Sequence, residues 1–159
     1  MSSLMENLNF SILAIPAYHA LAVFPHLAAV LYATNGRVNT VWDNRNPRSE
    51  VLKSAIAKRV DASKYAVYER LEAAHANSME NMPIFIAAVV LGNMAGLHKV
   101  EGSDGMTWFT GAFLLVRAAY ILVYALNDTQ PKSYARSLLY DIGVGLCWRT
   151  LFKAAAKLV

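Results

Sequence analysis

The sequence RLEAAHANSMENMPIF (residues 70–85) carries charged and amide side chains into the start of an apolar run. No residue from 82 to 97 is charged, so Asn77, Glu80 and Asn81 enter a predicted membrane span. A charge at the centre of a span costs roughly 3 kcal/mol on insertion scales, and such groups persist mainly where they face protein, water or ligand. The stretch therefore predicts both a membrane fold and a functional site within it.

The composition of the whole chain agrees with a membrane protein. Of its 159 residues, 56% are hydrophobic and 16% are charged, whereas ordinary soluble domains are about half apolar and about a quarter charged. The Lys and Arg residues that give the net charge of +4 lie between apolar runs and do not form a basic arm. Nucleic acid is therefore not an expected partner. Cys147 is the only cysteine, so no intrachain disulfide can form, and we expect its side chain to be buried in the core.

Four apolar runs predict an all-α fold, an integral membrane bundle of four helices in a single domain of residues 1–159. A helix needs about 20 apolar residues to cross a bilayer core, and the first run contains no charged residue. We expect a span here rather than a signal peptide, because no Lys or Arg precedes the run and its length exceeds that of such signals. The predicted spans are approximately residues 8–35, 73–97, 106–127 and 134–153.

Two histidines within the first run, His19 and His26, are seven residues apart and have no other ligand type nearby. This spacing is weak for a metal site. We therefore predict no metal and expect both histidines to be hydrogen-bonded inside the protein.

The segment from 37 to 70 is polar and basic, with eight Lys and Arg residues against four Asp and Glu residues. By the positive-inside rule this loop and the turn at 128–133 face the cytoplasm, and both termini lie on the opposite side. Asp61 is the expected N-cap of the next helix. That helix is predicted to run from about residue 62 to 97, about 54 Å, with a bend at Pro83, so its first half extends into the cytosol beyond a core of about 30 Å.

Polar side chains on two of these helices reach a similar depth. At about 1.5 Å per residue, Glu80 lies about 25 Å below the external end of its span, and Tyr120 and Tyr124 lie about 22 and 28 Å below theirs. At about 100° per residue, each helix carries its polar groups on one stripe, formed by Arg70, Asn77 and Asn81 on one helix and by Arg117, Tyr120 and Tyr124 on the other. His75 points away from Asn77.

Two interpretations of this convergence stay open. In the first, Arg117 pairs with Glu80 or Asp141 and holds the helices together, and the tyrosines complete that network. In the second, a carboxylate, two amides, an arginine and two phenols at one depth form a pocket for a small polar or amphipathic ligand, which we favour for the set as a whole.

The same residues resemble the MAPEG family, the membrane-associated proteins of eicosanoid and glutathione metabolism. The matching motifs are Glu69-Arg70, Ala74-His75-x-Asn77-x-x-Glu80-Asn81, Pro83-x-Phe85 and, in the third span, Arg117-x-x-Tyr120-x-x-x-Tyr124. The pattern is similar to the microsomal glutathione transferase branch, and the run from Glu72 to Asn77 is more like fungal and bacterial members.

The resemblance implies a homotrimer in the endoplasmic reticulum that binds glutathione between subunits near the cytoplasmic face. It implies that Arg70, His75, Asn77, Glu80 and Asn81 hold glutathione and that Tyr120, Tyr124, Arg117 and Glu80 carry the chemistry. A free thiol with a pKa near 8.5 is only a few per cent ionised at pH 7, and a cation that lowers this pKa by about two units makes most of it nucleophilic.

Four positions depart from the family pattern. One is Ser78, which stands where microsomal transferases and prostaglandin E synthase often have aspartate. Glu72 and Ala73 stand where family transferases commonly have arginine before the Ala-His pair, and Pro131 stands where leukotriene C4 synthase has its thiol-activating arginine. Lys132 and Arg136 are nearby cations that are candidates to replace it.

The leading functional interpretation is a membrane enzyme that acts on a lipophilic small molecule as a glutathione transferase or peroxidase. Two alternatives stay open. One is glutathione-independent isomerisation or rearrangement of a lipophilic metabolite, with Glu80, His75 or a tyrosine carrying the proton. The other is a non-catalytic lipid-binding scaffold, as the five-lipoxygenase-activating protein of this family is.

Overall fold

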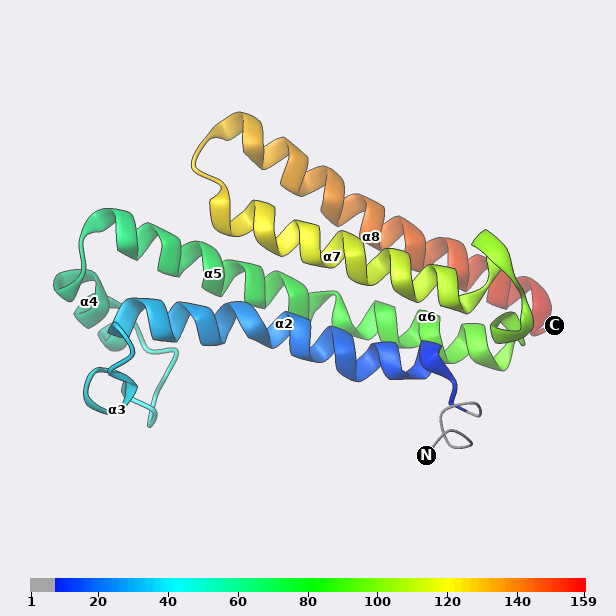
Figure 1. The fold of residues 1–159 in the computed structure, drawn as a ribbon, viewed down its shortest axis with the longest axis horizontal. Helices are drawn as coiled ribbons and strands as arrows, with labels where there is room; N and C mark the ends of the chain where they lie inside the picture. The colour runs from blue at the N-terminus through cyan, green and yellow to red at the C-terminus, as the bar shows by residue number, and fades with distance from the viewer. Residues whose placement is uncertain (1–7) are drawn as a thin grey trace.

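The computed structural model describes residues 8–159, and every regular element in that range is a helix. Long helices run side by side along the molecule (Figure 1): α2 (Phe10–Thr34), α5 (Ala62–Glu80) continued by α6 (Met82–Met94), α7 (Met106–Leu126) and α8 (Gln130–Lys157). The short helices α3 (Val38–Val41) and α4 (Glu50–Arg59) lie at the end of the molecule where α2 ends and α5 begins. The predicted all-α fold is confirmed for the described residues.

Two of the helices, α2 and α7, are long and apolar enough to cross a membrane, and they coincide with the first and third predicted spans. Helix α2 begins at the N-cap Asn9, whose side chain accepts a hydrogen bond from Ser11 N, and it ends at Asn35 in the left-handed conformation with φ of 52°. Pro16 and Pro25 lie within α2 and do not end it. The second and fourth predicted spans correspond to α5 with α6 and to α8.

The prediction of one helix from 62 to 97 is wrong in one respect, because the helix is interrupted at Asn81. Pro83 is the cause: it has no N–H to donate to Met79 O, whereas it fits the first turn of a new helix, where the N–H needs no partner. Asp61 is the N-cap of α5, as expected, and accepts a hydrogen bond of 2.8 Å from Lys64 N. The interruption leaves carbonyl groups at the end of α5 free for other donors.

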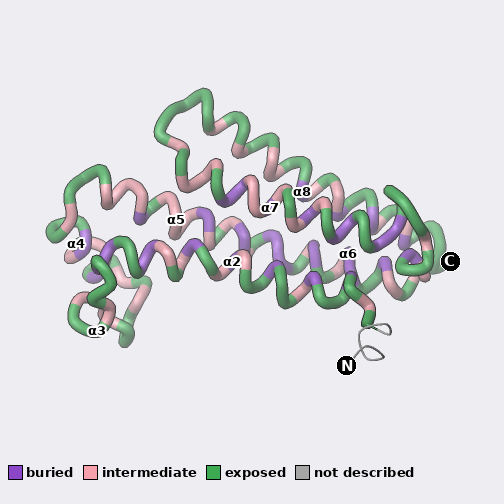
Figure 2. Tube along the Cα trace, in the orientation of Figure 1, coloured by how far each residue is buried: buried purple, intermediate pink, exposed green. Residues whose placement is uncertain are grey.

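The main core lies where α2, α6, α7 and α8 face one another, and Figure 2 shows buried residues along these inner faces. Its centre is aromatic, with the rings of Phe85 and Phe113 stacked at 4.2 Å between centroids and Tyr18 meeting both edge-on. Cys147 is fully buried in this core, which confirms the expectation from sequence. A second, smaller cluster joins α2, α4 and α5 through Ala29, Ala33, Leu52, Ile56 and Tyr68.

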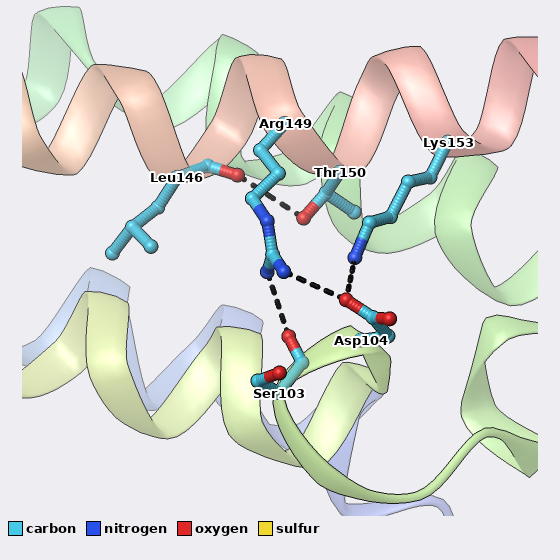
Figure 3. Close-up of polar contacts among 6 residues, drawn as sticks. All are labelled: Ser103, Asp104, Leu146, Arg149, Thr150 and Lys153. Atoms are coloured by element: carbon cyan, nitrogen blue, oxygen red, sulfur yellow. Dashed lines mark hydrogen bonds and ion pairs between the residues drawn. The ribbon is translucent and has the colours of Figure 1, made fainter.

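The other end of the molecule is closed by ion pairs between α8 and the connection from α6 to α7. In Figure 3, Arg149 and Lys153 extend from α8 to Asp104. Arg149 Nη2 lies 2.7 Å from Asp104 Oδ1, and its Nη1 donates to Ser103 O at 2.7 Å. These contacts hold the connection between α6 and α7 against α8.

Candidate functional site

A pocket of about 240 Å³ opens between α5, α7 and α8. It is lined by Asn77 of α5, by Tyr120 and Tyr124 of α7, and by four residues of α8: Arg136, Ser137, Tyr140 and Asp141. The structure therefore brings Asn77, Tyr120 and Tyr124 together, three of the residues that sequence analysis placed at one depth. Tyr124 lies in the last turn of α7 and Arg136 in the second turn of α8, so the pocket extends towards the turn that joins these two helices, which Figure 1 shows at one end of the pair.

Arg136 is the cation of the pocket lining, and it lies against one of the two pocket tyrosines. Its guanidinium carbon lies 4.6 Å from the centroid of the Tyr124 ring, a cation–π distance. Helix α8 begins at Gln130 with Pro131 in its first turn. The fixed φ of proline favours a helix start there, so the residue that departs from the family pattern begins the helix that carries Arg136.

Lys132, the other candidate cation, is engaged outside the pocket lining. Its Nζ lies 2.5 Å from Asp128 Oδ1. This hydrogen bond from Lys132 holds the pKa of Asp128 below its usual range. Of the two candidates, the structure therefore places only Arg136 against the tyrosines.

Arg117 lies behind the pocket and is fully buried. Its guanidinium carbon lies 4.2 Å from the centroid of the Tyr120 ring, and its Nη2 donates to Ser78 Oγ at 3.0 Å and to Asn77 O at 3.5 Å. Within the described part of the chain, no ion pair joins it to Glu80 or Asp141, the two partners considered from sequence. Its Nε and Nη1 have no hydrogen-bond partner among these residues.

The end of α5 explains how a cation can be held there without a carboxylate. The last carbonyls of a helix have no partner within the helix and carry its partial negative charge. Arg117 Nη2 and Asn81 Nδ2 both donate to Asn77 O, and Tyr18 Oη donates to Ser78 O at 2.8 Å. The end of α5 thus supplies both acceptors of the buried guanidinium, the backbone carbonyl of Asn77 and the hydroxyl of Ser78.

The remaining predicted binding residues lie outside the pocket lining. Arg70 Nε donates to Ala125 O at 3.2 Å, one of the last carbonyls of α7. Asn81 is buried at the interruption of the helix, and Glu80 is exposed at the end of α5. Their predicted roles in ligand binding stay predictions.

His75 faces α2, on the side of α5 away from Asn77. Its Nδ1 lies 2.9 Å from Ala22 O, so this nitrogen carries the proton, because a carbonyl oxygen only accepts. Beside it, His26 Nδ1 lies 2.7 Å from Glu72 Oε1. Glu72 and Ala73 line a separate pocket of about 460 Å³ on this side of α5. Two of the departures from the family pattern therefore lie outside the pocket that contains the tyrosines.

Sequence analysis did not identify Ser137 and Tyr140 as site residues and named Arg136 only as a nearby cation. The signal was available: Arg136 and Tyr140 are four residues apart and share one face of a helix, and Ser137 and Asp141 share the adjacent one. Among residues 8–159, no three His, Cys, Asp or Glu side chains lie close enough together to hold a metal ion.

Within residues 8–159, two helices are long and apolar enough to cross a bilayer, and a polar pocket opens between three of the helices. A family model described as the MAPEG family matches residues 12–156, nearly the whole chain, and the protein belongs to this family. The resemblance found in the sequence is confirmed. The family includes membrane glutathione transferases and related enzymes. No curated protein and no solved structure matches the chain.

Proposed function

We propose that this protein is a membrane enzyme that transfers the glutathione thiolate to a lipophilic electrophile, or uses it to reduce a lipophilic peroxide. The observation that carries the proposal is the position of Arg136 over Tyr124, in one pocket with Tyr120 and Asn77. This cation takes the place of the one that the sequence lacks at Pro131.

The chemistry follows from the charge of Arg136. A guanidinium stays protonated at all physiological pH values and stabilises a thiolate more than a thiol, so it lowers the pKa of a bound thiol. The phenol groups of Tyr120 and Tyr124 can donate hydrogen bonds to the same sulfur atom. The thiolate would then attack an electrophile that reaches the pocket from the lipid.

Binding of the rest of glutathione requires more than one chain supplies. A volume of about 240 Å³ lies below the range of about 300 to 1,000 Å³ of ordinary ligand pockets. Glu80 is exposed next to this region and has no ion-pair partner among the described residues. We propose that the protein is a homotrimer of four-span subunits, in which a neighbouring subunit closes the pocket and Glu80 binds the glutathione amine.

The arrangement in the membrane belongs to the same proposal. The polar segment from 37 to 70 and the turn at 128–133 lie on the cytoplasmic side, from which glutathione enters the pocket. The endoplasmic reticulum is the expected membrane. The pocket lies near this side, since Tyr124 is at the end of α7 and Arg136 is near the start of α8.

The test is calorimetric titration of glutathione into detergent-purified protein, together with thiolate absorbance as a function of pH. Wild type is expected to bind glutathione saturably and to lower the thiol pKa by about two units. Arg136→Met should remove most of this pKa shift. Lys132→Met is the matched control, because Lys132 lies on the same helix and pairs with Asp128 outside the pocket lining, and it should behave as wild type.

The outcomes separate the alternatives. Folded wild-type protein that binds no glutathione would contradict the proposal, and turnover of a lipophilic metabolite without thiol would favour the isomerase. Binding of a lipophilic ligand without any turnover would favour the scaffold. If Arg136→Met and Lys132→Met shifted the thiol pKa equally, Arg136 would not be the thiolate-stabilising cation.

A further inference from the structure

Asp141 is a carboxylate in the pocket lining that makes no ion pair within residues 8–159. It lines the pocket together with Arg136. Arg136 is nevertheless placed over the Tyr124 ring, and none of the ion pairs found among residues 8–159 includes Asp141. Nothing in the proposed thiol chemistry requires a negative charge at this position.

Asp141 is exposed on the surface of α8 in the single chain, and in the proposed topology this surface lies within the bilayer, where a charge is costly. The residue lies about 10 Å inside the fourth predicted span, counted from residue 134 at 1.5 Å per residue. Its neighbours on the exposed surface of α8 are Leu138 and Ile142, which are 61% and 41% exposed. Carboxylates at such depths are rare and persist where they face a polar cavity or a specific partner.

The position of Asp141 around α8 shows what it faces. Each residue of a helix is rotated by about 100° around the helix axis from the one before it. Measured from Asp141, one side of α8 carries Ser137 at about 40°, Tyr140 at about 100° and Arg136 at about 140°. Leu138 and Ile142 lie on its other side, at about 60° and 100°. Asp141 therefore stands at the boundary between the pocket wall and the apolar surface that faces lipid in the proposed topology.

A molecule that reaches the pocket from the lipid passes this boundary. Its apolar body would lie along Leu138 and Ile142, and a group beside Asp141 would meet a carboxylate in a medium of low dielectric. There a cationic group gains much more than it does in water, and an anionic group is repelled. A neutral apolar group would leave the carboxylate desolvated without compensation.

We propose that Asp141 makes this enzyme selective for lipophilic acceptors that carry a positively charged nitrogen, such as an ammonium group. The inference rests on the proposed function, because the acceptor must react with a thiolate held in the same pocket. Asp141 is thus a specificity-determining residue, whereas Arg136 serves the nucleophile.

The test compares two chloronitrobenzenes that carry the same alkyl chain, ended by trimethylammonium in one and by the isosteric tert-butyl group in the other. With each, the thiolate sulfur forms a bond to the ring carbon, the carbon–chlorine bond breaks, and chloride leaves. Wild type is expected to prefer the ammonium compound in kcat/KM. Asp141→Asn should lower that preference about tenfold, and Asp141→Glu should retain most of it.

The matched control is Asp128→Asn, which removes a carboxylate that is paired with Lys132 outside the pocket lining, and it should leave the preference unchanged. An equal preference in wild type and Asp141→Asn would overturn the proposal. Native mass spectrometry provides a second possible contradiction. If Asp141→Asn lost the oligomer but kept the preference for the ammonium compound, Asp141 would pair with a cation of a second copy, and the proposal would be overturned.

Binding decides the inference separately from turnover. Dodecyltrimethylammonium is titrated calorimetrically, below its micellar concentration, into wild type, Asp141→Asn and Asp128→Asn, with the neutral isostere as reference. About tenfold weaker ammonium binding by Asp141→Asn alone would support the proposal even if no thiol transfer were found and the proposed function failed. Equal binding by all three proteins would overturn it even if both chloronitrobenzenes were conjugated.

Discussion

At the scale of single residues, Arg117 shows how the protein buries a charge without an acid. The guanidinium is covered by the Tyr120 ring and held by Ser78 Oγ and Asn77 O. A hydrogen bond to a charged group contributes about 1.5 to 3 kcal/mol, more than a neutral one. Most of the polar attachment of Arg117 therefore depends on the last turn of α5.

This attachment gives a prediction for Ser78. Ser78→Ala removes the hydroxyl that accepts from Arg117 Nη2 at 3.0 Å, and we expect the free energy of unfolding to fall by about 1.5 to 3 kcal/mol. The measurement is a denaturant titration in detergent. Ser54→Ala, in the exposed part of α4, is the control and should change the free energy of unfolding by less than about 0.5 kcal/mol. Equal stability of the two variants would show that the hydroxyl does not hold Arg117.

At the scale of helices, Gly92 determines how closely α6 approaches α7 and α8. A Cβ atom at this position would lie 2.5 Å from Met106 Sδ and 3.2 Å from Thr150 Cγ2. Gly92 and Gly96 form a small-xxx-small pattern, which is typical of close helix contact. The close contact is at Gly92, whereas a Cβ at Gly96 would meet no atom within 4 Å.

We therefore expect Gly92→Ala to destabilise the protein by about 1 to 3 kcal/mol, since Met106 is buried and must shift within the core. Gly111→Ala is the control, because a Cβ there meets nothing within 4 Å, and alanine is the better helix former by about 1 kcal/mol. Thermal unfolding in detergent should place the midpoint of Gly92→Ala below wild type and that of Gly111→Ala at or above it. The reverse order would contradict the close contact.

The ion pairs that connect α8 to the turn before α7 make stability depend on pH. The hydrogen bond from Lys153, with the charge of Arg149 nearby, holds the pKa of Asp104 below its usual range. Because the folded pKa lies below the unfolded value near 3.9, the stabilisation is present at pH values above 3.9 and is lost as pH falls through the folded pKa. Thermal unfolding midpoints at pH 7 and pH 3 measure it.

Wild type should lose more stability between these two pH values than Asp104→Asn, and the variant should be the less stable of the two at pH 7. The groups are exposed, so salt should weaken the difference. A variant that kept the full pH dependence of wild type would show that other carboxylates are responsible.

Helix periodicity accounts for the part of the site that was predicted from sequence. Tyr120 and Tyr124 are four residues apart on one uninterrupted helix, so their common face follows from the spacing, and Asn77 follows from its depth. Arg136 and Tyr140 were not predicted as site residues because a turn separates them from α7, and the rotation of α8 about its own axis depends on side-chain contacts along its whole length. The interruption at Asn81 was expected only as a bend, since a proline can produce either.

At the scale of the whole molecule, the proposed topology is open to chemical labelling. Cys147 is the only cysteine, and Cys147→Ala provides a background for single cysteines at exposed Ser54 and Ser103. In sealed microsomes, a membrane-impermeant maleimide should label Ser54→Cys directly and Ser103→Cys only after permeabilisation, because the two residues lie on opposite sides of the proposed four-span chain. Direct labelling of both would contradict that arrangement.

The buried position of Arg117 also has a consequence for biogenesis. In the proposed topology, α7 enters the bilayer with an arginine that costs roughly 3 kcal/mol at the centre of a span. The groups that accept its hydrogen bonds, on Asn77 and Ser78, lie 40 and 39 residues earlier in the chain. These acceptor groups are therefore synthesised before Arg117. In the proposed topology, the end of α5 can accept the hydrogen bonds of Arg117 when α7 inserts, which offsets part of the cost of the buried charge.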